Sequence, residues 1–131
     1  MTNIHVSGKR RKAIARATLR DGNGTIRINK VPLVIYEPAM ARLKIEEPLL
    51  LAGDIVHKVN IDVNVHGGGQ SGQAIAARLA VARALATKHE SLRATFLDYD
   101  RTLLVADVRR NEPAKPNSHG KPRAKVQKSY R

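Results

Sequence analysis

The sequence predicts an α+β domain in which a mixed sheet is covered by helices mainly on one face. Two stretches, 12–20 and 58–66, alternate between apolar and polar residues with the period of a strand. A third observation is the alanine-rich segment after the glycines at 67–69, whose apolar residues have helical spacing. Strand, helix and strand in succession over 58–108 imply a crossover connection within this sheet.

The first predicted strand, 12–20, directs small residues inward and a largely basic set outward. Its inward residues are Ala13, Ala15, Ala17 and Leu19. The sequence Asp21-Gly22-Asn23-Gly24 is a strong turn signal. A return strand follows at 26–28, with Arg27 outward. These features predict a hairpin between 12–20 and 26–28.

Helices and further strands are predicted along the rest of the body. Pro38 and Pro48 each suit the first turn of a short helix, and we expect Met40, Leu43 and Leu49–Leu51 to face the core. The strand 58–66 is followed by Ser71 as an N-cap and about 17 residues of helix. The helix carries a core stripe of Ile75, Leu79, Ala82 and Ala86, and we expect a second helix at 91–97 and a last strand from Leu103 to Val108.

The net charge of +13 arises at the two ends of the chain. Residues 1–20 contain six lysines and arginines and no acid, whereas 21–108 contain ten basic and ten acidic residues. Residues 109–131 contain eight basic residues and one acid, with prolines that interrupt any periodicity. We therefore predict a globular RNA-binding domain over 1–108 and an extended basic C-terminal tail over 109–131. A neutral body with cationic ends suits a polyanion, because each contact with a phosphate releases a condensed counterion.

Other bulk properties exclude several classes of protein. The chain has no cysteine, which excludes disulfides and thiolate metal sites and fits a cytoplasmic protein. No apolar run approaches the ~20 residues of a membrane span, and the basic N-terminus lacks the apolar segment of a signal peptide. The five histidines do not pair at the spacing of metal ligands. No metal site or catalytic nucleophile is predicted, and His66, Asp98 and Asp100 receive no role.

Two features predict contacts with nucleic acid. Basic residues gather before and along the first strand, at Lys9, Arg10, Arg11, Lys12, Arg16 and Arg20, with Arg27 on the return strand. The alternatives are a solvated face or a nuclear-import signal. The glycine-rich turn at 67–73 would bring the backbone of Gly67, Gly68, Gly69, Ser71 and Gly72 near a phosphate.

A site for a free nucleotide at the glycine-rich turn is disfavoured. The P-loop ends in Gly-Lys followed by Ser or Thr, whereas this turn ends in Gly-Gln-Ala. Gly67, Gly69 and Gly72 have the spacing of the dinucleotide fingerprint, but the expected acid at the end of a second parallel strand is missing. A tight turn that touches the RNA backbone is the better interpretation.

Six segments resemble one family of ribosomal proteins. They are GKRRKAIARA at 8–17, IRINK at 26–30, EPLLLAG at 47–53, GGGQSGQA at 67–74, ARAL at 82–85 and QKSYR at 127–131. In this order they are similar to the family of the ninth small-subunit ribosomal protein, in its archaeal and eukaryotic form. The resemblance implies a non-catalytic protein without cofactors, whose fold is like the second domain of ribosomal protein S five, with an uncommon left-handed crossover.

The resemblance also implies partners for the basic residues. Members of the family lie on ribosomal RNA in the head of the small subunit, beside other head proteins, and extend their tail to P-site transfer RNA. Contacts with ribosomal RNA are then expected from the basic residues named above and from Arg109, Arg110, Lys115, Lys121, Arg123 and Lys125. Contacts with transfer RNA are expected from Lys128, Ser129, Tyr130 and Arg131.

Three alternatives remain open at this stage. The tail could act only as a loose solubilising segment. The protein could be a small nucleotide-dependent enzyme of the kinase group that shares this general fold, with phosphate bound at Gly67–Gly72. It could also be a free-standing basic RNA-binding factor that acts outside the ribosome.

Overall fold

The computed structural model describes residues 3–106, 108–109, 113–114 and 116. Five strands form one sheet in the order β1-β2-β5-β3-β4, namely β1 (Ile4–Arg10), β2 (Ala13–Asp21), β3 (Ile26–Ile28), β4 (Val31–Pro32) and β5 (Val59–His66). The helices are α1 (Ala39–Ala52), α2 (Gln70–Lys88) and α3 (Ser91–Tyr99), with short 3-10 turns η1 (Leu33–Ile35), η2 (Gly53–Lys58) and η3 (Arg101–Leu103). Within these described ranges, no helix combines the length and apolar character of a membrane span.

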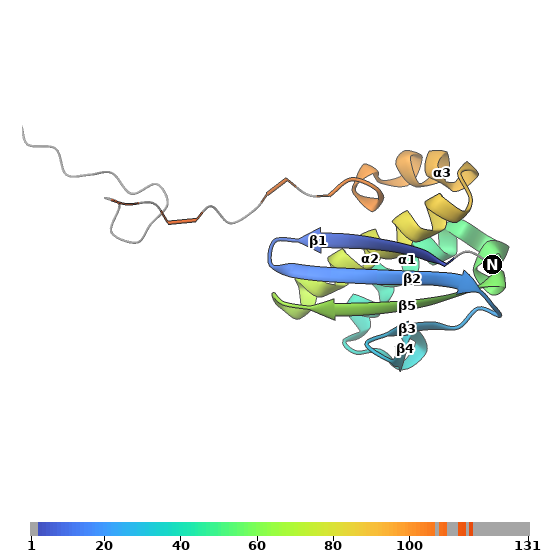
Figure 1. Ribbon diagram of the computed structural model, residues 1–131, viewed down its shortest axis with the longest axis horizontal. Helices are drawn as coiled ribbons and strands as arrows, with labels where there is room; N and C mark the ends of the chain where they lie inside the picture. Colours follow the sequence, from blue (N-terminus) through green and yellow to red (C-terminus); the bar gives the residue numbers. More distant parts are fainter. Residues whose placement is uncertain (1–2, 107, 110–112, 115, 117–131) are drawn as a thin grey trace, which may run out of the picture.

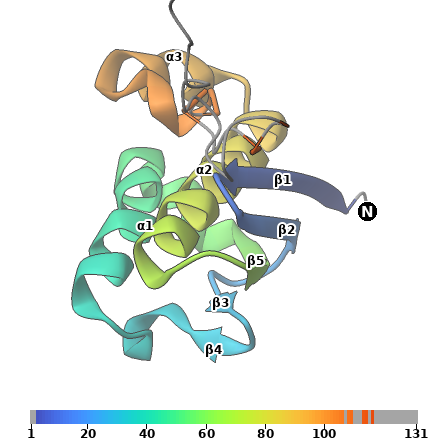
Figure 2. The same ribbon diagram turned by 90° about the vertical axis from the view of Figure 1, so that its left-hand side faces the viewer.

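All helices lie on one side of the sheet, and the other side is open (Figures 1 and 2). The sheet is mixed, because β3 and β5 pair in parallel while the other neighbours pair antiparallel. The predicted α+β class, with a mixed sheet and helices mainly on one face, is therefore confirmed.

The crossover predicted over 58–108 is wrong, because no strand follows α2 and α3 in the described chain. The crossover connection runs instead from β3 through β4 and α1 to β5 and is left-handed. In Figure 1 the helices lie behind the sheet, β5 points to the left and its parallel neighbour β3 lies below it. A chain that runs along β3, passes behind the sheet and returns one strand higher turns in the left-handed sense. General rules for crossover connections favour the right-handed sense. The family resemblance implied a left-handed crossover, which is the one observed.

The predicted hairpin between 12–20 and 26–28 is wrong, because β5 lies between these two segments. Residues 59–66 pair with β2 along its length, from Asp21↔Val59 to Ile14↔His66. This ladder is much longer than any that the three-residue strand β3 could form with β2. Asn60 fixes the arrangement, since its Oδ1 accepts hydrogen bonds from the backbone amides of Asn23 and Thr25 at 3.1 and 3.0 Å. The predicted turn signal thus leads the chain around the end of β5.

The strand β1 was not predicted, although Ile4, Val6 and Gly8 alternate with polar residues along it. It forms an antiparallel hairpin with β2 in which Arg10 faces Ala13. A Cβ atom at position 8 would collide with the Ala76 carbonyl oxygen of α2. It would also lie only 2.8 Å from the Ala80 amide nitrogen. Glycine at this position lets the helix approach the strand closely.

A single helix, α1, replaces the two short helices predicted at Pro38 and Pro48. Pro48 lies inside α1, where it is fully buried on the face that packs against the core. The core-facing residues of α1 are Ala41, Ile45, Pro48 and Ala52. The prediction that Met40 and Leu43 face the core is wrong, since both are exposed. Of Leu49–Leu51, the outer two pack partly against the core and Leu50 is exposed.

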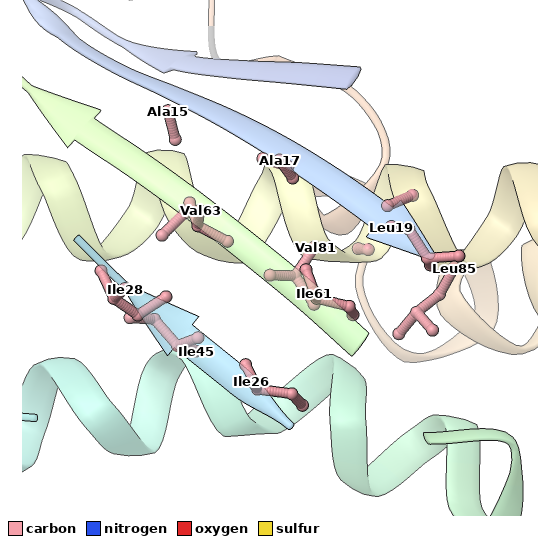
Figure 3. Packing of buried hydrophobic residues seen from close by; sticks show 14 of the residues in the cluster. Ala15, Ala17, Leu19, Ile26, Ile28, Ile45, Ile61, Val63, Val81 and Leu85 are labelled. Carbon is pink, nitrogen blue, oxygen red and sulfur yellow. The ribbon is translucent and has the colours of Figure 1, made fainter. Parts of the chain in front are cut away.

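The helix α2 packs across the sheet and supplies most of the helical side of the core. Figure 3 shows Val81 and Leu85 of α2 among Ala15, Ala17, Leu19, Ile61 and Val63 of the strands. The predicted stripe holds for Leu79, Ala82 and Ala86, which are buried, whereas Ile75 is half-buried. The helix begins at Gln70 with Gly69 as its N-cap, so the prediction of Ser71 as N-cap is wrong. Gly67 and Gly68 have positive φ and turn the chain directly into the helix.

The C-terminal part of the body differs from the prediction in one element. The helix predicted at 91–97 is confirmed as α3, with Leu92 and Phe96 buried. The strand predicted from Leu103 to Val108 is absent from the described part of this segment, where η3 and a turn follow α3. Asp100 explains the change, because its Oδ1 accepts a hydrogen bond from the Thr102 amide at 3.0 Å and starts a 3-10 turn.

One buried arginine joins α2 to both neighbouring segments. Arg78 is 8% exposed, and its guanidinium lies 2.7 Å from Glu47 of α1 and 3.2 Å from Asp100. It also donates a hydrogen bond to Thr102 Oγ1 at 3.3 Å. These contacts give Asp100 a structural role. Hydrogen bonds from Thr102, together with Arg78, lower the pKa of Asp100 below its ordinary value of 3.8.

The lowered pKa of Asp100 predicts a stability change in acid. A lowered native pKa contributes stability that is fully present well above pH 3.8 and is lost as the pH falls through the native value. We expect Asp100→Asn to lower the free energy of unfolding by about 0.5–1 kcal/mol at pH 7, a small value because the carboxylate is solvent-screened. Urea unfolding at several pH values should show this difference shrinking below pH ~4. A difference that stays constant down to pH ~2 would contradict the assignment.

Candidate nucleic-acid interface

The β1–β2 hairpin presents four consecutive basic residues at its end. Lys9 and Arg10 complete β1, and Arg11 and Lys12 form the two-residue connection to β2. Lys9, Arg11 and Lys12 are exposed, and Arg10 is half-buried. We call Lys9–Lys12 the hairpin tip. Lys12 thus lies in the turn, and not on the strand face of Arg16 and Arg20 where the sequence placed it.

The glycine loop, Gly67–Gly69, packs directly against the hairpin tip. A side chain at Gly67 would collide with the Lys12 carbonyl oxygen, and one at Gly68 would come within 3.1 Å of the Ala13 amide nitrogen. Gln73 holds the loop, since its Nε2 donates a hydrogen bond to the Gly67 carbonyl at 3.1 Å. The two features that the sequence singled out therefore form one surface.

A groove of about 400 Å³ lies between the hairpin tip and the first turn of α2. Its lining consists of Arg10, Arg11, Lys12, Gly68, Gly69, Ser71, Gly72 and Ile75. The first amides of a helix have no acceptor within the helix. The groove therefore combines three cationic side chains with backbone donors, which is the chemistry that a phosphate ester requires.

The open face of the sheet continues this surface away from the hairpin tip. The register places Ser7, Arg16 and Asn64 in one row across β1, β2 and β5. A neighbouring row contains Lys9, Ile14 and His66, and a third contains His5, Thr18 and Asp62. Arg20 lies further along β2, beside Asn60. We call this surface the open face, and no helix covers it (Figure 2).

The cations of the open face differ in whether a carboxylate of the protein neutralises their charge. Arg16 and Arg20 are exposed, and no carboxylate lies within ion-pair distance of either in the described chain. Arg27 of β3, by contrast, donates a hydrogen bond from Nε to Asp62 Oδ1 at 2.8 Å, which raises the pKa of Arg27 above its ordinary value. Arg27 is therefore partly neutralised by the protein itself.

Sequence reasoning missed the polar residues that β1 contributes to the open face. A shallow hollow of about 440 Å³ is lined by His5, Ser7, Arg16, Thr18 and Asn64, together with the adjoining backbone. The His5 ring nitrogen Nδ1 lies 3.1 Å from Thr18 Oγ1. The signal that could have identified these residues is the alternation of Ile4, Val6 and Gly8.

The beginning of the predicted tail lies next to the hairpin tip. Arg10 donates a hydrogen bond from Nη1 to the Arg109 carbonyl oxygen at 3.4 Å. Arg83 of α2 connects β1 to the segment that follows α3, because it donates hydrogen bonds to the carbonyl oxygens of Ser7 at 2.9 Å and Leu104 at 3.1 Å. The remaining predicted tail contacts lie outside the described residues. They are Arg110, Lys115, Lys121, Arg123, Lys125, Lys128, Ser129, Tyr130 and Arg131.

Comparison with known proteins gives a consistent result over the whole chain. The family described as ribosomal protein S9/S16 matches residues 8–131. Small ribosomal subunit protein uS9 of Methanococcus vannielii is 52% identical over 134 residues, which cover 100% of both chains. The proteins of the same name from two strains of Methanococcus maripaludis are 50% identical, again over 100% of both chains. The chain therefore belongs to the ribosomal protein S9/S16 family.

Proposed function

We propose that this protein is a structural component of the small ribosomal subunit, in which the hairpin tip, the groove and the open face bind ribosomal RNA. The observation that carries this proposal is the contact between the hairpin tip and the glycine loop. It places the cationic residues 9–12 and the backbone donors at 67–72 on one surface of a body whose charge is otherwise balanced.

Family membership bears on the alternatives. Ribosomal proteins of this family are structural and are not enzymes, so the interpretation as a nucleotide-dependent kinase is dropped. The protein is accordingly proposed to act bound to ribosomes in the cytoplasm. Sedimentation tests the remaining alternative of a free-standing factor, because a ribosomal protein co-migrates with small subunits in cell extract and a free factor does not.

The open face and the groove have complementary roles in this proposal. Arg16, Arg20 and the hairpin tip supply charge that attracts the phosphate backbone and sets the salt dependence of binding. The glycine loop and the first turn of α2 supply short-range hydrogen bonds that fix the position of one phosphate. Arg27 contributes less net charge, because Asp62 already compensates it.

The C-terminal tail is proposed to contact ribosomal RNA and then P-site transfer RNA. Family resemblance and the charge of residues 109–131 support this part of the proposal. Arg109 begins the tail beside Arg10, so the tail leaves the body next to the proposed RNA surface. Lys128 and Arg131 would meet phosphates of the transfer RNA, and Tyr130 would stack on a base.

The first prediction concerns the exposed arginines of β2. The double variant Arg16→Ala/Arg20→Ala removes two phosphate contacts, so the slope of log affinity against log salt should fall by about 1.4–1.8. Filter binding of the pure protein to small-subunit ribosomal RNA measures this slope. Arg93→Ala is the matched control, because Arg93 is an exposed cation on α3 in the helical layer. Equal slopes for the double variant and the wild type would contradict the role of the open face.

The second prediction concerns the groove. Gly69 has extended backbone angles, and no atom lies within 4 Å of the place that a Cβ would occupy, so a larger side chain there fits the fold. Gly69→Leu should fill the groove and weaken ribosomal RNA binding about tenfold, the cost of lost charge-assisted hydrogen bonds. Gly69→Ala controls for the change of backbone entropy, and thermal unfolding verifies that both variants are folded. Wild-type affinity of the folded Leu variant would exclude the groove as a phosphate site.

The third prediction concerns the end of the tail. Deletion of Lys128–Arg131 should leave subunit assembly largely intact and weaken transfer RNA binding at the P site. Filter binding of transfer RNA to purified mutant subunits measures the effect, with a Lys128→Gln/Arg131→Gln variant to separate the contribution of charge from that of Tyr130. Unchanged affinity of the deletion variant at every salt concentration would reject the role of the tail.

A further inference from the structure

The helix α1 is apolar on both of its sides, although only one side packs against the protein. Ala41, Ile45, Pro48 and Ala52 face the core. On the opposite side, Met40, Leu43 and Leu50 are 68%, 55% and 79% exposed. Positions separated by three and seven residues fall on the same side of a helix. The helix also carries Arg42, Lys44, Glu46 and Glu47, so these exposed apolar residues have charged neighbours. The outer side of α1 lacks a cover within the described chain.

The turn η1 extends this exposed apolar surface. Val34 and Ile35 are 76% and 65% exposed. Arg42 connects them to α1, since its Nη1 donates a hydrogen bond to the Val34 carbonyl at 3.2 Å. We call the surface formed by Val34, Ile35, Met40, Leu43 and Leu50 the apolar ridge.

A small hollow borders the apolar ridge where α1 and α2 begin. It has a volume of about 160 Å³, and its lining is apolar at Pro38, Met40, Ala41 and Ala74 and polar at Lys44, Gln70 and Ser71. This size suits one aliphatic side chain of a partner. Interfaces commonly gain most of their affinity from one or two such anchored side chains.

The charge near the ridge distinguishes a protein partner from RNA. Residues 34–55 contain four acids and two bases, in a chain whose net charge is +13. The acids are Glu37, Glu46, Glu47 and Asp54. Arg78 pairs with Glu47 and Arg42 lies 4.0 Å from Glu46, which leaves Glu37 and Asp54 without an ion-pair partner in the described chain. A local excess of acid repels phosphates and attracts a basic polypeptide. It also disfavours a symmetric dimer through this surface, because the two copies would bring like charges together.

The apolar ridge and the open face lie on opposite sides of the molecule. The sheet separates the open face from the helical layer, and α1 belongs to that layer (Figures 1 and 2). RNA on the open face therefore leaves Leu43 and Leu50 of α1 accessible to a second partner, whereas the hollow beside Met40 adjoins the groove, with which it shares Ser71.

We propose that the apolar ridge is the docking surface for a segment of a neighbouring ribosomal protein that combines aliphatic side chains with lysine or arginine. The aliphatic side chains cover Leu43 and Leu50 and fill the hollow beside Met40, while the basic ones face Glu37 and Asp54. This inference rests on the proposed function, since the partner is reached only within the assembled small subunit.

Photo-crosslinking in assembled small subunits tests the inference. The photoreactive residue p-benzoylphenylalanine is placed at position 43, 50 or 20 of the full chain, and crosslinked peptides are identified by mass spectrometry. We expect positions 43 and 50 to crosslink to a basic protein segment and position 20, on the open face, to crosslink to ribosomal RNA. Crosslinks from 43 and 50 to RNA or to another copy of this chain would overturn the docking surface.

The crosslinking experiment separates failure of this inference from failure of the proposed function. Subunits in which position 20 crosslinks to ribosomal RNA, while 43 and 50 give no protein product, overturn the docking surface and leave the proposed function standing. Absence of the full chain from small subunits overturns both.

A variant with a polar ridge provides a second measurement. Leu43→Gln/Leu50→Gln changes only exposed side chains and no charge, so the fold and the affinity of the free protein for ribosomal RNA should remain within about twofold. Occupancy of the crosslinked partner in purified subunits should fall at least about tenfold, as for loss of an interface hot spot. Leu97→Gln is the matched control, because Leu97 is an exposed leucine on α3. Full partner occupancy in the double variant would refute the proposal.

Discussion

The close packing of α2 on the small residues of β1 and β2 determines the rest of the structure. Gly8, Ala13, Ala15 and Ala17 form a surface on which the alanine-rich helix lies with little space between the backbones. Large side chains are not needed there, which explains how a chain with only 3% aromatic residues forms a closed core. Because most apolar residues of the strands face the helices, the other side of the sheet remains largely polar and open, with Ile14 as an apolar residue on it.

Ion pairs within the described body neutralise several of its cations. Arg78 is paired with Glu47 and Asp100, Arg27 with Asp62, and Lys88 with Asp21 at 2.6 Å. These pairs neutralise the cations that lie near the carboxylates of the described body. The hydrogen bond from Lys88 also lowers the pKa of Asp21, an exposed group. Arg16 and Arg20 of β2 have no such partner in the described chain, and they belong to the proposed RNA surface.

Local sequence patterns predicted the elements better than their partners. Alternation identified 12–20 and 58–66, and helical spacing identified 70–88 and 91–99, because these patterns reflect which side of each element is buried. The pairing of β5 with β2 could not be inferred locally, since it depends on competition between a long ladder and a short one. The exposure of Met40 and Leu43 could not be predicted for a different reason. Apolar residues on both sides of α1 give no periodic signal that would show which side is buried. The hairpin tip and the glycine loop were both recognised from residue type, but their contact required the fold.

The insertion of β5 between β2 and β3 has a consequence for synthesis of the chain. When residues 13–28 have left the exit tunnel, one edge of β2 and one edge of β3 have no partner, because both pair with a strand that is translated later. Their backbone donors and acceptors stay available for wrong pairing until His66 has emerged. Arg16 and Arg20 lie on this strand, and charged residues of this kind disfavour pairing between exposed strand edges.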